Sequence, residues 1–446
     1  MLTHFVSFWV YWGIWLIIPF LIDGVAALAL FFGLVYAMFR KKAAAIHGDQ
    51  AHWPRVSIII PVANGEKSLG QCLQSIRQQT YPARQLEVVV VDNASTDDTV
   101  GVFQHEQAKL WDGQMHWISI PFRGKPGALN TGIHMTTGHY VINIDADVAL
   151  SANAIEAMVA AFESDPSISA ATGGVEVLPA APEDGLLPYL IAECEFQEYL
   201  SAFWMGRQYQ TMTNSLFTLA GAFSAFRREA LLHTFLYDGT TVSEDTKLTL
   251  DIYKHIKAAR IVCVPEAIVY LEPTPSLSSL YAQRVRWQRG QLEVAALNPE
   301  RIRPNFFQMR GLSLSRLLMI DHTLLFPRLV WMFLFPLMVF FGYPFALVFN
   351  ALVLMYIFYA GINYFTTATT FPIVGKDERK RLLKSWWIPI LMPAYRFLIF
   401  LFRVAGSIIP LKEPAAWRVK DPILETRLAW GQLVARIRQL WGRLRR

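Results

Sequence analysis

Two aspartates, Asp145 and Asp147, follow an apolar run at residues 141–144 that is typical of a buried strand. Residues two apart on a strand share a face, so a loop just past the strand can turn both carboxylates toward one ion. Carboxylate oxygens suit a hard divalent cation, and a cation held there can bind a diphosphate. The pair therefore indicates nucleotide-linked group transfer. The alternative is that both acids only end the strand and cap the helix that follows, and so short a motif does not decide between the two.

Four other groups of polar residues lie between residues 55 and 291. In chain order they are Asp92 after a second apolar run, Lys125 in a glycine-containing segment, Ser243-Glu244-Asp245, and the helical set Gln283, Arg284, Arg286 and Trp287. Arginines bind diphosphates through charge-assisted hydrogen bonds, and a tryptophan offers a flat apolar platform for a sugar ring. Each group also has a purely structural interpretation: a polar turn at Asp92, a helix start at Ser243, and a basic surface turn around Trp287.

The segments that must position these groups alternate between strand and helix patterns. Strands are predicted at residues 56–60, 86–91, 115–120 and 139–144, and helices at residues 69–76, 97–110, 125–135 and 152–162. Such alternation predicts a parallel sheet with helices on both faces, whose ligands bind beyond the carboxyl ends of the strands. Asp92 and Asp145 fall at two of those ends, so the topology would bring them to one edge of the sheet.

The pattern is looser from residue 167 to residue 291. Strands are predicted at residues 170–177, 219–226 and 261–264, and helices at residues 188–204, 246–256 and 276–296. Three glutamates, Glu193, Glu195 and Glu198, lie on the first of these helices, and we expect them to form a solvated face.

The composition is too apolar for an ordinary soluble protein. Of the 446 residues, 53% are hydrophobic and only 17% are charged, and the mean hydropathy is +0.29, which indicates several membrane segments. Residues 5–39 form either an interfacial piece followed by one span or two short spans joined at Asp23-Gly24. Further spans are predicted at residues 322–341 and 345–365, and an interfacial helix at residues 305–318. Residues 386–410 form a third span, or an interfacial or re-entrant segment.

Basic residues orient these segments. The cluster Arg40-Lys41-Lys42 and a second one at residues 376–384 are expected on the cytoplasmic side of the membrane. Residues 412–446 have the pattern of a basic amphipathic helix, which would bind the anionic headgroups of membrane lipids. The alternative for this tail is a helix that packs on a partner protein or on the rest of the chain.

Composition also excludes some classes of protein. Cys72, Cys194 and Cys263 are far apart, so the sequence shows no disulfide framework or zinc site and is typical of a reduced compartment. No stripe of basic and aromatic residues indicates nucleic-acid binding. No positive charge precedes the first apolar run, which argues against a cleaved signal peptide.

The ordered set D…K…DxD…[TS]ED…Q(Q/R)xRW, followed by membrane segments, resembles the membrane-bound family 2 glycosyltransferases. This family includes synthases of cellulose, hyaluronan, chitin oligosaccharides and poly-N-acetylglucosamine. The resemblance covers residues 55–295 in detail and the flanking membrane segments more loosely. It implies an α/β fold, a GT-A-like nucleotide-sugar domain with a mostly parallel central sheet, flanked by transmembrane and interfacial helices. The expected domains are a membrane segment at 1–42, the cytoplasmic catalytic domain at 55–298, interfacial and transmembrane helices at 299–411, and the tail at 412–446.

The resemblance also implies a role for each residue of the set. Asp245 would be the general base, and Asp147 with Asp145 would hold Mg or Mn. The donor would bind at Asp92, Lys125, Asp145, Gln283, Arg284 and Arg286, and the acceptor at Glu244 and Trp287. This chain departs from the pattern in having Asn93 where relatives often have a second acid, and Ser243 where they have threonine.

The implied function is inverting transfer of a sugar from a UDP-sugar to a growing β-linked glycan. It would take place at the inner face of the plasma membrane, in a multi-pass protein. A translocation channel would need the segment at residues 386–410, a dimer or an export partner. One alternative is a single-addition enzyme with a lipid-linked acceptor. Another is a non-catalytic scaffold of a polysaccharide-export complex, which would predict lost acids, whereas all of them are present.

Overall fold

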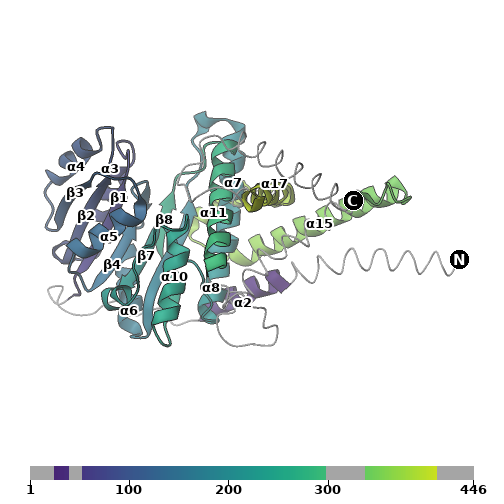
Figure 1. Ribbon diagram of the computed structural model, residues 1–446. Helices are drawn as coiled ribbons and strands as arrows, with labels where there is room; N and C mark the ends of the chain where they lie inside the picture. Colours follow the sequence, from purple (N-terminus) through teal and green to yellow (C-terminus); the bar gives the residue numbers. More distant parts are fainter. Residues whose placement is uncertain (1–24, 40–52, 298–336, 409–446) are drawn as a thin grey trace, which may run out of the picture.

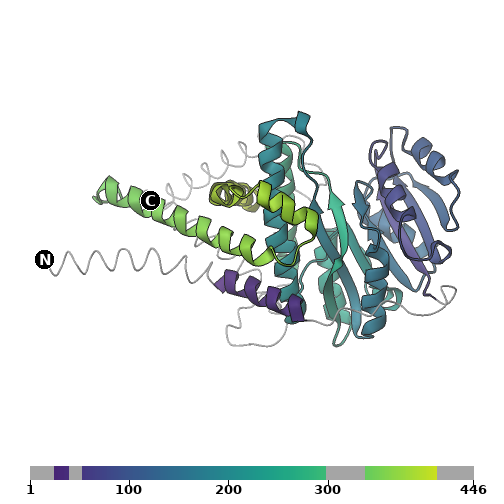
Figure 2. The ribbon, with the colours of Figure 1, turned by 180° about the vertical axis from the view of Figure 1, so that it is seen from behind.

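The structure is a computed structural model that describes residues 25–39, 53–297 and 337–408 (Figure 1). An α/β domain forms one end of the molecule, and the helices α2, α15 and α17 lie together on its other side (Figures 1 and 2). The segments predicted at residues 5–24, 305–318 and 322–336 and the amphipathic tail at 412–446 lie outside the described residues.

The described elements follow the strand and helix patterns of the sequence closely in the first half of the domain. The strands are β1 (Val56–Val62), β2 (Leu86–Asn93), β3 (Gln114–Ile120), β4 (Tyr140–Ile144), β5 (Val148–Leu150), β6 (Ile168–Val177), β7 (Phe223–Arg227) and β8 (Arg260–Leu271). The domain helices are α3 (Leu69–Arg77), α4 (Thr99–Gln107), α5 (Lys125–Met135), α6 (Ala154–Ser164), α7 (Leu186–Tyr199), α8 (Arg207–Met212), α9 (Arg228–Leu232), α10 (Glu244–His255) and α11 (Leu277–Leu297). The remaining helices are α2 (Val25–Phe39), α15 (Phe345–Thr370), α16 (Lys376–Lys384) and α17 (Ile388–Ile408).

The sheet is mixed rather than mostly parallel, which corrects the expectation from the sequence. Its eight strands run in the order β3-β2-β1-β4-β7-β6-β8-β5. The pairs from β3 to β4 are parallel, as predicted, but β7 is antiparallel to both β4 and β6, and β5 is antiparallel to β8. Only the β6–β8 pair in the second half is parallel. The result is a GT-A-like α/β fold whose parallel half ends at β4.

The buried core lies on both faces of the sheet. Successive residues of a strand point to opposite faces, and accordingly Ile58 packs with α3 and α6 while Ile59 packs with α5 and α10. Both isoleucines are fully buried, and burial of each such side chain contributes roughly 1.5–3 kcal/mol. The two helical layers therefore fix the sheet, and with it the loops at its carboxyl edge.

Asp145 and Asp147 do not cap a helix. The chain forms β5 directly after Asp147, and the residue that precedes α6 is Asn153. The short strand β5 was not predicted, because three residues are too few to show a periodic pattern. Asp145 and Asp147 therefore occupy a loop between two strands.

Two described helices, α15 and α17, are long and apolar enough to cross a membrane. The first agrees with the span predicted at residues 345–365, and the second falls within residues 386–410, for which the sequence left several interpretations open. Between them lies α16, which carries the basic cluster of residues 376–384. These two helices are therefore candidate membrane spans by their length and apolar composition, and a basic segment connects them.

The expectation that the glutamates of α7 form a solvated face is wrong. Glu193 and Glu195 are buried, and Glu198 is partly buried. Arg381 pairs with Glu193 at 2.8 Å, and Arg284 pairs with Glu198 at 2.7 Å. Buried carboxylates are retained where such cations compensate their loss of hydration, and these cations come from far along the chain.

Candidate active site

The predicted site residues gather at the carboxyl edge of the parallel half of the sheet. The strand order reverses between β1 and β4, and a crevice forms beyond the strand ends at such a point. Asp145 directly follows β4. Because β7 runs antiparallel to β4, the turn before β7 lies at the same edge, where the Asp145 amide donates to the Ala222 carbonyl at 3.1 Å.

Lys125 is the centre of the charged cluster. It is the first residue of α5, and its Nζ lies 2.5 Å from Asp145 Oδ1 and 3.8 Å from Glu244 Oε1. The same ammonium group donates to the Gly221 carbonyl at 3.4 Å. Burial lowers the pKa of Lys125, but the carboxylates of Asp145 and Glu244 outweigh it, so the pKa lies above its usual value. A charged lysine at a helix N-terminus is an arrangement that can bind a phosphate group.

Gly124 and Asn93 hold this lysine in place. Gly124 has φ 156°, a conformation that side chains with a Cβ rarely adopt. Its amide donates to Asn93 Oδ1 at 2.8 Å, which ties the start of α5 to the end of β2. Asn93, where relatives often carry an acid, thus has a defined structural task in this chain.

Asp245 lies in the first turn of α10, where the helix dipole favours negative charge. Its Oδ1 accepts a hydrogen bond from the Thr246 amide at 2.6 Å, and its other oxygen faces Gly221. Burial raises the pKa of Asp245, although Thr246 and Lys125 oppose the rise. Burial likewise raises the pKa of Glu244 to about 7. Both carboxyl groups therefore have a pKa above that of an ordinary acid, which suits a group that accepts a proton.

Gly221 lies between Asp245 and Lys125. A Cβ at this position would lie 3.3 Å from Asp245 Oδ2 and 3.4 Å from Lys125 Nζ. Both contacts are tight, so both side chains would have to move by a few tenths of an ångström. The Gly221 carbonyl also accepts a hydrogen bond from Asn143 Nδ2 at 2.9 Å, and Asn143 Oδ1 accepts one from Tyr237 at 3.1 Å, so the backbone beneath the site is held firmly.

Gly221→Ala is expected to lower the rate of UDP release about 10-fold, because a displaced base and cation no longer match the reacting groups. The matched control is Gly239→Ala, whose Cβ would meet only Pro126 at 3.9 Å, an ordinary contact. Turnover should be unchanged in the control. Equal rates for wild type and Gly221→Ala would contradict the tight geometry assigned to Asp245 and Lys125.

Asp147 differs from Asp145 in remaining accessible to solvent. Its pKa is nevertheless raised, first by the partial loss of hydration and then by Asp145, while Lys125 and Arg286 oppose the rise. No group of three potential metal ligands occurs in the described part of the chain. Mg and Mn sites that also bind diphosphate need only one or two carboxylates from the protein, and an accessible, electrostatically strained Asp147 beside Asp145 fits that requirement.

Asp92 is nearly buried at the end of β2 and already has partners for both oxygens. It accepts hydrogen bonds from the Ser95 amide at 3.0 Å and from the Ser119 hydroxyl at 2.9 Å. These bonds shape the turn, which agrees with the structural interpretation, and they orient the carboxylate at the carboxyl edge of the sheet. That the Asp92 side chain also contacts the uracil of a UDP-sugar stays a prediction.

The candidate site residues of α11 lie in two different environments. The charge of Arg286 lowers the pKa of Asp147, which places Arg286 beside the charged cluster. Arg284 is buried and pairs with Glu195 and Glu198 of α7 instead. Trp287 is half-buried and packs edge-on against Phe203 with 6.1 Å between ring centres.

Two further features of α11 complete this part of the site. Gln283 Oε1 is buried and has no hydrogen-bond partner among the described residues. Gly290 lets α11 approach the start of α10, since a Cβ there would lie only 1.9 Å from Ser243 Oγ. The helix that carries Arg286 and Trp287 is thus held directly against the segment Ser243-Glu244-Asp245.

Arg207 is a residue that sequence reasoning missed. It is buried, and within the described ranges it contacts no carboxylate: its Nη1 reaches Thr172 Oγ1 at 3.5 Å and the Gly173 carbonyl at 3.4 Å. The guanidinium also lies over the Phe203 ring, 4.6 Å from its centre. Burial lowers the pKa of Arg207, while Cys263 and Asp245 oppose this. The buried charge of Arg207 interacts favourably with the Asp245 carboxylate, and no local sequence pattern around residue 207 predicts this.

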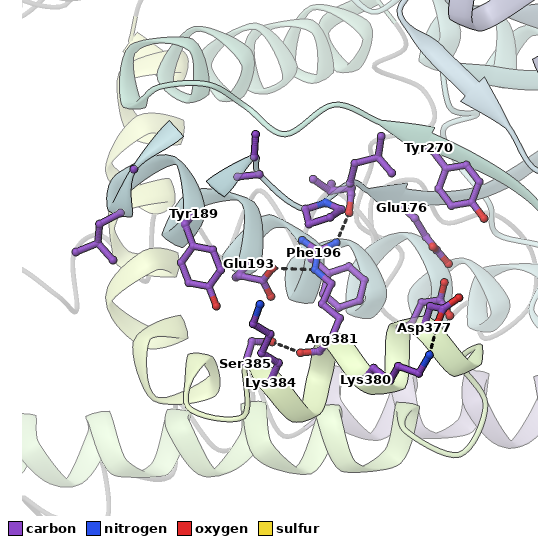
Figure 3. Close-up of a pocket in the computed structure, with 18 residues that line it drawn as sticks. Glu176, Tyr189, Glu193, Phe196, Tyr270, Asp377, Lys380, Arg381, Lys384 and Ser385 are labelled. Atoms are coloured by element: carbon purple, nitrogen blue, oxygen red, sulfur yellow. Dashed lines mark hydrogen bonds and ion pairs between the residues drawn. The ribbon is translucent and has the colours of Figure 1, made fainter. Parts of the chain in front are cut away.

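A cavity of about 820 Å³ lies elsewhere, between the domain and α16 (Figure 3). In this view, Tyr189 and Glu193 from α7 face Arg381 and Lys384 from α16. The Arg381 guanidinium stacks on Phe196 at 4.0 Å, and burial with Glu378 raises the pKa of Glu176 to about 7. None of the predicted site residues lines this cavity, so we assign it to the junction between the domain and its apolar helices.

Comparison with known proteins shows which family and which fold this chain is similar to. Residues 57–235 match the family described as Glycosyl transferase family 2. The chain is 24% identical over 267 residues to a poly-beta-1,6-N-acetyl-D-glucosamine synthase of Staphylococcus epidermidis, which covers 59% of this chain and 62% of that protein. It is 23% identical over 240 residues to the synthase of the same name from Staphylococcus aureus strain COL, covering 54% of this chain and 55% of that protein.

A solved structure shares the fold. The mannosyltransferase PcManGT from Pyrobaculum calidifontis, in complex with GDP-Man and Mn2+, has a TM-score of 0.57 and 19% identity. The superposition covers 90% of this chain and 98% of that one. The curated relatives, in contrast, are matched over less than two thirds of their own length.

Proposed function

Because residues 57–235 form a glycosyl transferase family 2 domain, we propose that this chain is an inverting glycosyltransferase that extends a β-linked glycan from a UDP-sugar. The observation that carries the proposal is the cluster of Lys125, Asp145, Glu244 and Asp245. It combines a phosphate-binding cation with a partly buried base whose pKa is raised. Charged groups with shifted pKa values cluster at functional sites, and a non-catalytic scaffold does not require such a cluster.

The residues of the cluster divide the reaction between them. Asp245 accepts the proton of the acceptor hydroxyl as that oxygen attacks the sugar on the face opposite the leaving group. Lys125 and Arg286 neutralise the negative charge that develops on the departing UDP. Asp147 and Asp145 would hold Mg or Mn, which supplies Lewis-acid stabilisation of the same diphosphate. Trp287 offers the apolar face on which the acceptor sugar rests.

We propose UDP-N-acetylglucosamine as the donor, in line with the names of the two staphylococcal relatives. The acceptor is the growing glycan, and the alternative is single addition to a lipid-linked acceptor. The helices α15 and α17 support attachment to a membrane by their length and composition. We place the catalytic domain on the cytoplasmic side of the plasma membrane, because α16 carries the basic residues between them.

The test is release of UDP or GDP by the purified full chain in lipid nanodiscs with Mg or Mn. We expect turnover with UDP-N-acetylglucosamine and little with UDP-glucose, UDP-N-acetylgalactosamine or GDP-mannose. Mass spectrometry of the product then separates a polymer from a single addition. Turnover with another donor would correct the sugar, and no release with any donor would contradict the catalytic proposal.

A further inference from the structure

Arg284 is among the most completely buried large side chains of the protein, with 2% of its surface exposed. Its Nη2 lies 2.7 Å from Glu198 Oε2 and 3.5 Å from Glu195 Oε1, both on α7. Burial lowers the pKa of Arg284, but Glu198 and the other groups around it outweigh burial, so the pKa is raised and the side chain stays charged. The two glutamates therefore already compensate the charge of Arg284 inside the protein, and a bound diphosphate is not required to neutralise it.

The same guanidinium reaches the candidate membrane helix α17. Arg284 Nη2 donates to the Tyr395 hydroxyl at 3.3 Å, and that hydroxyl donates to Glu198 Oε2 at 2.9 Å. Apolar side chains of α7, α11 and α17 close around this junction, among them Leu280 and Met392. Figure 1 shows the three helices side by side. The junction thus joins three elements that are far apart in the sequence.

On its other side, Arg284 supports Trp287. The guanidinium carbon lies 4.5 Å from the centre of the Trp287 ring, within the range of a cation–π contact. It also lies over Tyr199, at 5.8 Å. Phe203 meets the same tryptophan edge-on. One guanidinium therefore fixes the orientation of the indole and fastens it to α7 and α17 at the same time.

We propose that Arg284 is a positioning residue, which holds Trp287 for the acceptor sugar and ties it to Tyr395 of α17, and that it does not contact the donor. The inference rests on the proposed function, because it presumes that Trp287 receives the acceptor. The proposal adds that the acceptor end of the site depends on the packing of the apolar helix α17 against the domain. The donor end is built by Lys125 at the start of α5 and Asp145 after β4, whereas this junction is built by α7, α11 and α17.

The first experiment compares Tyr395→Phe and Arg284→Lys with wild type in nanodiscs. We expect the KM for a β-linked N-acetylglucosamine oligosaccharide acceptor to rise about fivefold in Tyr395→Phe, the effect of one lost hydrogen bond. Arg284→Lys should raise it further, because an ammonium group cannot span the carboxylates and the indole together. The Kd for UDP, measured by calorimetry, should stay the same. The matched control is Tyr356→Phe, which removes a hydroxyl bound to Ile390 of α17 at 2.6 Å but leaves the junction intact.

The second experiment asks whether Arg284 acts through Trp287. In a Trp287→Phe background, Arg284→Lys should have little further effect on the acceptor KM, whereas independent roles would give additive effects. Weaker UDP binding in Arg284→Lys would overturn the proposal and restore a donor contact. A lower melting temperature with unchanged acceptor KM in both variants would also overturn it. A wild-type protein that binds UDP but transfers no sugar would instead contradict the proposed function.

Discussion

Asp245→Asn is expected to lower kcat by about 10²–10⁴-fold, which is the usual contribution of a positioned general base. The amide has the shape of the carboxylate and can still accept the hydrogen bond from the Thr246 amide, but it cannot take a proton from the acceptor. UDP affinity should therefore remain, because Lys125 and Asp145 are untouched. The measurement is UDP release under saturating donor, with UDP binding followed separately by calorimetry.

The matched control for this variant is Asp251→Asn, six residues further along α10. Asp251 is also a buried carboxylate, but it pairs with Lys247 at 2.7 Å and does not touch the cluster. Its loss should lower the melting temperature and leave kcat largely intact. If both variants lost activity equally, the defect would come from a weakened α10 and the role of Asp245 as base would be refuted.

The pH dependence gives a second measure of the same residue. The base works as the carboxylate, so protonation stops transfer, and a raised pKa moves this loss to higher pH. Because burial raises the pKa of Asp245, kcat/KM should fall on acidification at a higher pH than an exposed aspartate would cause. Burial raises the pKa of the neighbouring Glu244 to about 7, so Glu244→Gln identifies which of the two carboxyls produces the acidic limb of the profile.

The local sequence pattern was sufficient to predict the helices and strands in the half of the domain that is built from parallel strands. The bounds of α5 agree with the prediction, and β1 to β4 differ from it by only one or two residues. In that half each strand is buried on both faces, so an apolar run marks it clearly. An apolar run does not indicate the direction of its strand. The antiparallel orientation of β7 depends on pairing with residues about eighty positions away along the chain, such as that of Phe223 with Ile144.

Burial of charge was the least predictable property. Glu193 is compensated by an arginine 188 residues away, and Glu195 by one 89 residues away, so the sequence around α7 gives no sign of either pair. A helix with acids at several positions is ordinarily a solvated face, and only tertiary packing overrides that. The motif around Arg284 shows the same limit, because its residue types are right for a phosphate while its surroundings are those of a structural junction.

The sequence predicted which residues lie near one another at the candidate site, but it did not predict the backbone that spaces them. Lys125, Asp145, Glu244 and Asp245 lie at one edge, as the order of the motifs suggested. Gly221, which separates the base from the cation, was expected inside a strand beginning at residue 219, yet β7 begins at Phe223. Residues 219–222, which precede β7, form the backbone beneath the site. Hydrogen bonds with Asn143 and Thr172 hold this irregular segment, and the amino-acid types of the four residues do not predict its conformation.

Asp147→Asn is expected to have two opposite effects, a loss of activity and a gain in stability of the metal-free protein. The loss of turnover should reach about 10²-fold, because the charge on the departing UDP would lose several kcal/mol of metal stabilisation. The affinity for Mn in the presence of UDP, measured by electron paramagnetic resonance, should fall in parallel. Asp112→Asn, which removes an exposed carboxylate paired with Arg84, is the control and should change neither quantity.

The gain in stability follows from the sign of the pKa shift. Folding raises the pKa of Asp147, so its charged form is less favourable in the folded than in the unfolded protein, and the folded state is penalised at any pH above that raised pKa. An asparagine carries no charge and removes the penalty together with the repulsion from Asp145. In the presence of a chelator, the melting temperature of Asp147→Asn at neutral pH should therefore exceed that of wild type, and the difference should shrink as the pH is lowered. A lower melting temperature across this range would show that Asp147 stabilises the fold, and the two aspartates would then be better explained as part of the loop between β4 and β5 than as a place kept for a cation.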